Sequence, residues 1–167
     1  TRWVEYSLSA PVMVILISYT LGIRERFLIF AIAVLIGITM PFGYWVETVA
    51  RPASATAWTK PLSTRLTPWF LGNVPQLAAW LIIVAQFYYS NFDNDSMPWW
   101  LHIVLWGEVV LFFSFGFASV LSQWSQPRFF YRGELLFQAL SLISKGLLGI
   151  LLLANVLMFS RFEEVYE

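Results

Sequence analysis

The sequence LLFQALSLISKGLLGILLLANVLMF, residues Leu135–Phe159, decides the fold class, because its 25 residues are apolar over the length of one membrane-spanning helix. One full charge, Lys145, lies inside this stretch. A lysine amine in hydrocarbon costs roughly 2.5–3.5 kcal/mol on insertion scales, so an ionisable residue inside a span indicates a functional site by default. A desolvated amine reacts readily with an aldehyde to form a Schiff base, and this chemistry is expected of Lys145.

The composition of the whole chain also indicates an integral membrane protein. Of its 167 residues, 59% are hydrophobic and 12% are charged, whereas a soluble domain carries about 25% charged residues. The formal net charge is zero, so nucleic acid is a poor partner. The lack of cysteine excludes disulfides, thiolate metal sites and thiol nucleophiles. We expect a single domain, residues 1–167, that crosses the lipid bilayer of a cell membrane several times.

Apolar runs separated by polar turns predict an all-α fold, a polytopic transmembrane helix bundle. Pro11 should kink the first helix, because proline removes a backbone donor. Residues 47–67 are rich in Pro, Ser, Thr and Ala and are predicted to form a loop. The expected spans are residues 3–23, 27–46, 68–89, 97–121 and 135–159.

The basic residues predict the orientation of these spans. Six of them lie on the side of the N-terminus and three on the other side. The positive-inside rule therefore places the N-terminus in the cytoplasm and the C-terminus outside the cell. The two groups are Arg2, Arg51, Lys60, Arg65, Arg128 and Arg132 on the first side, and Arg24, Arg26 and Arg161 on the second.

A polar stripe runs along the helix that carries the lysine. Glu134, Gln138, Ser141 and Lys145 follow one another at intervals of four, three and four residues, which places them on one helical face. Such a stripe faces protein or water and not lipid. Lys145 lies about ten residues from the nearer helix end, roughly 15 Å deep, which is too deep for comfortable snorkelling. The alternative is a purely structural lysine in a salt bridge.

A buried cation requires a nearby anion, and two acidic residues, Glu5 and Glu108, lie well inside spans. Glu5 is four residues from Thr1, so the first helix must continue upstream of Thr1 if Glu5 and Lys145 are to meet at one depth. Glu108, near the middle of its span, is expected either to be protonated, because burial disfavours the charged form, or to be hydrogen-bonded. His102 lies six residues earlier on nearly the opposite face, so no metal site is expected.

Two motifs carry a resemblance to a known family. RWVEYSLSAPVM, residues 2–13, together with SLISKG, residues 141–146, resembles the heliorhodopsins, which are seven-helix retinal proteins distantly related to the microbial rhodopsins. The resemblance covers the whole chain, which looks like helices three to seven of this fold with helices one and two missing. Heliorhodopsins keep the N-terminus inside and the C-terminus outside, and this matches the orientation expected from the basic residues.

The resemblance implies roles for individual residues. Lys145 would bind all-trans retinal as a protonated Schiff base, with Glu5 as its counterion and Ser141 as a neighbour. A protonated Schiff base in a dry pocket needs a fixed negative charge to remain protonated. Further residues of the retinal pocket implied by the resemblance are Tyr6, Ser9, Met13 and, at the ring end, Trp80.

The chain departs from the pumping rhodopsins in two ways. Ser141 stands where pumps have a second aspartate, and Leu16 stands where they have a cytoplasmic proton donor, eleven residues after the counterion. Both departures argue against active pumping. The pocket tryptophan of the pumps' sixth helix also lacks a clear match, and Phe112 or Phe113 stands near that position.

Three functions remain open. The first is a light-sensing photoreceptor that signals by conformational change, and here the resemblance implies a homodimer and an unidentified signalling partner. The second is a light-gated proton or ion conductor that uses Glu108, with Gln138 and Glu134 on the cytoplasmic side. The third is a transporter without retinal, in which Lys145 and Glu5 form a buried ion pair. An enzyme is not expected, because the sequence has no nucleophile–base constellation, phosphate loop or metal cluster.

Overall fold

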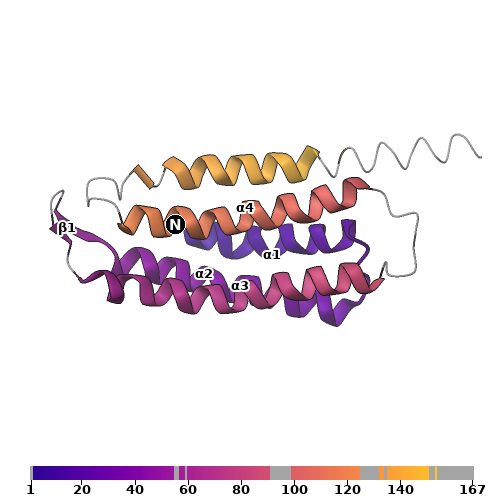
Figure 1. The fold of residues 1–167 in the computed structure, drawn as a ribbon, viewed down its shortest axis with the longest axis horizontal. Helices are drawn as coiled ribbons and strands as arrows, with labels where there is room; N and C mark the ends of the chain where they lie inside the picture. Colours follow the sequence, from indigo (N-terminus) through magenta and orange to yellow (C-terminus); the bar gives the residue numbers. More distant parts are fainter. Residues whose placement is uncertain are drawn as a thin grey trace, which may run out of the picture.

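The computed structural model describes residues 2–54, 57–58, 60–90, 99–124, 132–133, 135–150 and 153. Long helices dominate these residues, and Figure 1 shows them lying side by side in one bundle, with successive helices running in opposite directions. The all-α fold predicted from the sequence is therefore confirmed. The helices are α1 (Arg2–Thr20), α2 (Arg26–Val49), α3 (Leu62–Ser90), α4 (Trp99–Trp124) and a last helix, Leu135–Ile150, called the lysine helix from here on.

The helices agree with a protein that crosses a membrane more than once. By length and composition, three helices of the described chain can span a bilayer: Arg26–Val49, Leu62–Ser90 and Leu101–Trp124. The lysine helix is apolar but shorter over its described residues, and most of the expected span beyond Ile150 lies outside them. Helix α1 is not among the three, and it carries Glu5 in its first turn.

The distribution of apolar side chains follows the same logic. The core that joins the helices consists of aliphatic and aromatic residues, and large apolar side chains also cover the outside of the bundle, as expected of a surface that faces lipid. Fully buried core residues include Ile17, Ile32, Ile83 and Leu105. Exposed apolar residues include Phe27, Phe30, Leu81 and Val110.

A tight turn joins α1 to α2. Gly22 has φ +83°, a left-handed conformation that glycine adopts without steric cost. The backbone N–H of Ile23 donates to the carbonyl of Ser18 at 2.9 Å, which completes the last turn of α1. Glu25 then caps α2, because its side chain accepts hydrogen bonds from the backbone N–H groups of Phe27 and Leu28. These contacts in the polar turn fix where α1 ends and where the antiparallel helix α2 begins.

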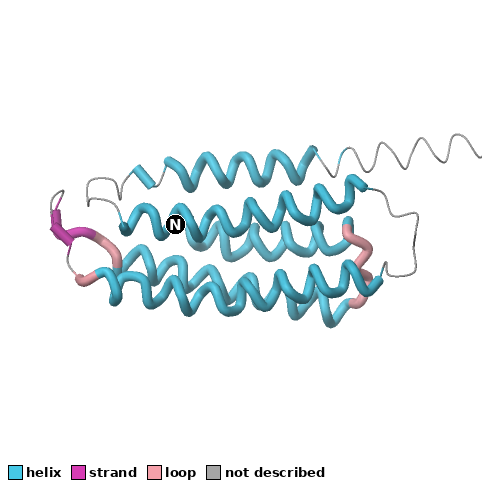
Figure 2. The backbone as a smooth tube through the Cα atoms, viewed as in Figure 1, coloured by secondary structure: helices cyan, strands magenta, loops and turns pink. Residues whose placement is uncertain are grey.

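The segment between α2 and α3 is more regular than the loop predicted for residues 47–67. Helix α2 continues to Val49, and a short antiparallel hairpin follows, formed by β1 (Pro52–Ser54) and β2 (Ala57–Trp58). Figure 2 shows this hairpin in magenta at one end of the bundle. Strands of two and three residues are too short to leave an alternating pattern in the sequence, and this is why the hairpin was not predicted.

Helix α3 begins at Leu62, earlier than the start predicted at Pro68. Pro68 and Pro75 both lie inside α3, as Pro11 lies inside α1 and Pro41 inside α2. Proline is a misleading helix boundary here, because packed neighbouring helices compensate for the missing donor in membrane helices.

The early start of α3 changes the place of Arg65, which the sequence assigned to the loop. Arg65 lies in the first turns of α3, and its side chain is only 5% exposed. Its Cζ lies 3.7 Å from the centroid of the Trp58 ring, and its Nη1 donates to the carbonyl oxygen of Gln123 at 2.9 Å. A cation–π contact and a charge-assisted hydrogen bond therefore attach the hairpin and the end of α4 to α3.

Candidate functional site

Lys145 and Glu5, the two residues that the sequence paired, meet in the structure. The Nζ atom of Lys145 donates a hydrogen bond to Oε1 of Glu5 at 2.7 Å, within salt-bridge distance. Lys145 comes from the lysine helix and Glu5 from α1. The first and last helices of the described bundle are thus joined by one ion pair.

The surroundings of this pair differ from the buried ion pair of the transporter hypothesis. The side chain of Lys145 is 37% exposed and that of Glu5 is 62% exposed. Neighbouring residues on both helices are also exposed, for example Leu8 on α1 and Leu142 on the lysine helix. Within the described chain the pair therefore lies at a surface where α1 and the lysine helix meet, and not in the core.

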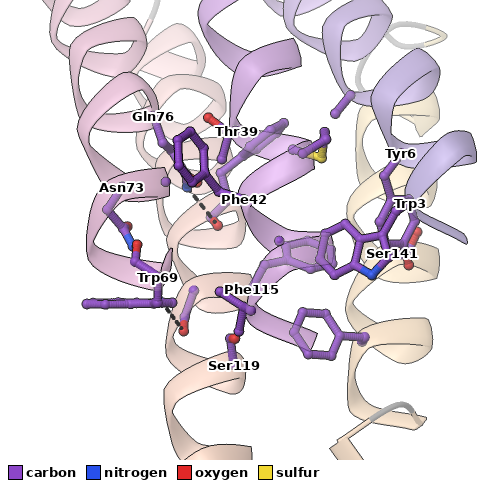
Figure 3. Close-up of a pocket in the computed structure, with 18 of the residues that line it drawn as sticks. Trp3, Tyr6, Thr39, Phe42, Trp69, Asn73, Gln76, Phe115, Ser119 and Ser141 are labelled. Atoms are coloured by element: carbon purple, nitrogen blue, oxygen red, sulfur yellow. Dashed lines mark hydrogen bonds between the residues drawn. The ribbon is translucent and has the colours of Figure 1, made fainter. Parts of the chain in front are cut away.

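A cavity opens inside the bundle next to the pair. It holds about 870 Å³ of space free of atoms, part of which is continuous with the exterior, and Lys145 is one of its lining residues. All four labelled helices and the lysine helix contribute to its wall, as the close-up in Figure 3 illustrates. Its aromatic lining residues are Trp3, Tyr6, Phe42, Trp69, Phe112, Phe115 and Phe137.

Two glycines allow the aromatic wall to pack closely. A Cβ atom built on Gly43 would overlap the indole ring of Trp3. A Cβ atom built on Gly72 would lie 2.7 Å from the Cβ atom of Phe42, closer than two carbon atoms can approach. The wall therefore depends on these two positions having no side chain.

The wall nearest to the lysine amine consists of Trp3 and Tyr6. The two rings are in edge-to-face contact with centroids 5.9 Å apart, and Nζ of Lys145 lies 5.6 Å from the centroid of the Tyr6 ring. The indole N–H of Trp3 donates to Oε2 of Glu47 near the end of α2. Sequence reasoning did not single out Trp3, because tryptophans near span ends are common at the membrane interface.

Several polar side chains of the cavity wall make hydrogen bonds within and between helices. Figure 3 draws two of them between α3 and α4: Nε1 of Trp69 donates to the carbonyl of Gly116 at 3.0 Å, and Nε2 of Gln76 donates to the carbonyl of Phe112 at 3.3 Å. Asn73 donates to the carbonyl of Trp69 at 2.8 Å. Polar residues inside the third predicted span were a signal for these contacts, and sequence reasoning passed over it.

The lysine helix contributes two serines to the wall. Ser141 lines the cavity one turn before Lys145 and is partly buried. Ser144 also lines it, and its Oγ atom is buried without a hydrogen-bond partner in the described part of the chain. A buried hydroxyl in this state favours a polar ligand group beside it, because buried polar groups are nearly always hydrogen-bonded.

The structure brings together most of the residues that the sequence assigned to a pocket. Tyr6, Ser9 and Met13 lie on one face of α1 and line the cavity, together with Ser141 and Lys145 of the lysine helix. Their spacing along α1 is three and four residues, as one helical face requires. The structure thus brings these five residues to one cavity, whereas Trp3 and Ala10 of α1, which also line it, were not among the predicted residues.

Trp80, assigned to the ring end of the pocket, lies behind the cavity wall. It is 3% exposed and is not a lining residue, but its ring contacts that of Phe112, with centroids 5.1 Å apart. Phe112 does line the cavity, whereas Phe113, the other residue considered at that position, does not. Trp80 therefore supports the wall through Phe112.

The residues assigned to an ion pathway have three different positions. Glu108 is fully buried in α4, and neither of its carboxylate oxygens has a hydrogen-bond partner among the described residues. Gln138 is exposed on the outside of the lysine helix. Glu134 lies outside the described residues. The expected stripe from Glu134 to Lys145 therefore does not face the interior at Gln138.

The fold and the site define a class: a multi-pass helical membrane protein with an aromatic cavity that ends at a lysine–carboxylate pair. The model of the heliorhodopsin family matches residues 1–157, and the chain belongs to the heliorhodopsin family. The resemblance found in the sequence is thereby confirmed. None of the curated proteins that were compared matches the chain. Membership of this family suggests a rhodopsin-type photoreceptor with a retinal chromophore.

Proposed function

We propose that this chain is a light-sensing photoreceptor that binds all-trans retinal as a protonated Schiff base on Lys145, with Glu5 as the counterion, and that it signals and does not pump ions. The observation that carries the proposal is the 2.7 Å contact between Nζ of Lys145 and Oε1 of Glu5 at the edge of an aromatic cavity. An amine, a carboxylate and an apolar cavity are the three parts that this chemistry requires.

The residues of the cavity fit retinal. Lys145 supplies a primary amine for the aldehyde, and aromatic residues such as Trp69 and Phe115 supply an apolar wall for a conjugated chain. Retinal, when bound, supplies absorption of visible light and a change of shape on illumination. The buried hydroxyl of Ser144, next to Lys145 in sequence, provides a polar group at the same end of the cavity.

The protein's own residues then stabilise the bound state. The carboxylate of Glu5 accepts a hydrogen bond from the lysine nitrogen and balances its positive charge. The face of Tyr6, 5.6 Å from the nitrogen, adds a weaker attraction for a cation. Trp3 packs against Tyr6 and donates a hydrogen bond to Glu47, and these two contacts hold the aromatic wall beside the lysine side chain.

Two positions support signalling over pumping. Leu16 of α1, where pumps have a proton donor, has an apolar side chain that is partly exposed on the outside of the bundle. Ser141 lines the cavity with a hydroxyl where pumps have a second aspartate. A signalling photoreceptor also needs a recipient, and we include in the proposal a homodimer, an unidentified partner protein and a C-terminus on the extracellular side.

A visible absorption spectrum of the protein expressed with all-trans retinal tests the proposal. We expect a visible band in the unchanged protein and none in Lys145→Ala. Lys60→Ala is the matched control, because Lys60 is the only other lysine and lies exposed between the hairpin and α3. A colourless unchanged protein would contradict the proposal and favour the transporter hypothesis.

A light-gated proton conductor is the second candidate, and the burial of Glu108 in α4 favours it. A carboxyl group inside a span is typical of proton pathways. Electrical recording under illumination separates the two candidates. A photocurrent that disappears in Glu108→Gln would support the conductor, whereas no photocurrent in the unchanged protein would remove it.

A further inference from the structure

Two buried polar side chains of α3 and α4 have no place in the retinal site. Glu108 is 0% exposed and both of its carboxylate oxygens lack a hydrogen-bond partner within the described chain. Trp80 is 3% exposed, and its indole Nε1 also lacks one. Buried polar groups are almost always hydrogen-bonded, and an isolated carboxylate charge in a membrane interior is costly.

The contacts between α3 and α4 fix the register from which the relative position of these two side chains is inferred. Trp69 bonds to Gly116, and Gln76 bonds to Phe112, so the two antiparallel helices run past each other in a fixed register. Trp80 lies one turn beyond Gln76 on α3. Glu108 lies one turn before Phe112 on α4.

Gln76 and Phe112 are the bonded pair from which the register continues. One further helical turn on α3 leads to Trp80, and one further turn on α4 leads to Glu108. The two residues are therefore inferred to lie at one level and on the facing sides of the helices. Further along the same two helices, the ring centroids of Phe87 and His102 lie 5.4 Å apart. This contact continues the same register.

The described surroundings of Glu108 are apolar and provide no counter-charge, which favours the neutral form of its carboxyl group. The buried core that contains Glu108's neighbours Val104, Leu105 and Phe112 is apolar. Three charged or titratable side chains of the packed helices have other partners. His102 stacks on Phe87 and Tyr88, Lys145 pairs with Glu5, and Arg65 bonds to Gln123. No described residue forms an ion pair with Glu108.

We propose that Glu108 is a proton-binding site: its carboxyl group is neutral in the resting protein and accepts a hydrogen bond from the indole N–H of Trp80. The bond requires a rotation of these side chains, because neither the indole N–H nor the carboxylate oxygens have a hydrogen-bond partner in the described chain. The bond satisfies the indole N–H and one carboxyl oxygen at once. The carboxyl O–H donates to a backbone carbonyl one turn earlier, as buried hydroxyl groups in helices do.

This site is connected to the cavity through aromatic contacts. The ring of Trp80 touches that of Phe112, which is part of the cavity wall. A ligand that changes shape in the cavity displaces Phe112 and Trp80, and so alters the hydrogen bond to Glu108. This second part of the inference rests on the proposed function, whereas the proton on Glu108 does not.

Infrared spectroscopy of the protein in lipid, kept in the dark, tests the proton directly. We expect a carbonyl stretch of a protonated carboxylic acid that is lost in Glu108→Gln and moves to higher frequency in Trp80→Phe, where the donor is removed. Glu25→Gln and Trp106→Phe are the matched controls, because both residues are exposed and neither should change the band. A spectrum without this band, or a band that survives in Glu108→Gln, overturns the proposal.

If Glu108→Gln does not fold, Glu108→Asp keeps the acid on a shorter side chain and must shift the band. An unshifted band in that variant overturns the proposal equally. The measurement is made with and without retinal, so a protein that binds no retinal still reports on the proton.

Illumination tests the connection to the cavity. The light-minus-dark spectrum of the pigment should contain a shift of the Glu108 carbonyl band, and Trp80→Phe should reduce that shift. A dark band without any light-induced change would overturn the connection while the proton site stands. A colourless protein with an intact dark band would instead count against the proposed function.

Discussion

Glu5 and Glu108 are both carboxyl groups of a membrane protein, and the structure gives them opposite surroundings. Glu5 is 62% exposed in the first turn of α1, and one of its oxygens accepts a hydrogen bond from Lys145. Glu108 is 0% exposed in α4 and has no partner in the described chain. The difference teaches that neighbours, and not residue type, determine the role: Glu5 is suited to carry a charge and Glu108 to carry a proton.

The largest expected effect concerns the cation that Glu5 faces. Lys145→Ala removes the amine, so the visible band should be lost completely, and Glu5 should be left without its partner. The measurement is the absorption spectrum after addition of retinal, with Lys60→Ala as the control. A band of normal intensity in Lys145→Ala would break the comparison, because Glu5 would then have no cation to balance.

The second effect separates the two acids. Glu5→Gln removes a negative charge beside the protonated Schiff base, which makes the proton easier to lose. The pH at which the visible band is half lost should therefore fall by about 1–3 units, the usual effect of a neighbouring opposite charge. Glu108→Gln should leave this midpoint unchanged, because a neutral acid is replaced by a neutral amide. The reverse result would exchange the roles of the two residues.

A third prediction concerns the close packing of the cavity wall. Gly72→Val places side-chain atoms where Phe42 already lies, so we expect a loss of about 1–3 kcal/mol in the free energy of unfolding and poor pigment formation. Gly107→Ala is the control, because no atom lies within 4 Å of its added Cβ. Denaturation curves of both variants provide the measurement. Equal stability of the two variants would show that the wall is not closely packed.

The smallest effect is expected at the wall beside the lysine. Trp3→Phe keeps an aromatic ring but removes the N–H that donates to Glu47, at a cost of about 1 kcal/mol. We expect a small displacement of the absorption maximum and a slightly lower melting temperature. Phe70→Leu, at an exposed position on α3, serves as a control for a lost aromatic surface. A complete loss of colour in Trp3→Phe would show that this ring does more than orient the wall.

Much of the fold and the centre of the site could be predicted from the sequence. Lys145 and Glu5 are conspicuous because a charge is rare in an apolar run, and the same contrast identifies Glu108. Tyr6, Ser9 and Met13 were implied by the resemblance to the heliorhodopsins, and their spacing of three and four residues agrees with one helical face.

The remaining features depend on tertiary packing, which leaves little trace in one sequence. Trp3 and Trp80 are both tryptophans in helices, yet one forms the cavity wall and the other lies behind Phe112. Their ring positions are set by neighbours on other helices. The burial of Arg65 likewise depends on two neighbours. Trp58 lies in a strand too short to leave a sequence pattern, and Gln123 at the end of α4 is 58 residues away.

The contact between Lys145 and Glu5 also has a consequence for the chain as a polymer. The two residues are 140 positions apart, so their bond closes a loop that contains almost the whole described bundle. Long loops lose more conformational freedom on closure than short ones, so this contact is costly to form from an unfolded chain. We therefore expect it to form late in folding, after the helices between α1 and the lysine helix have assembled and have brought the two ends together.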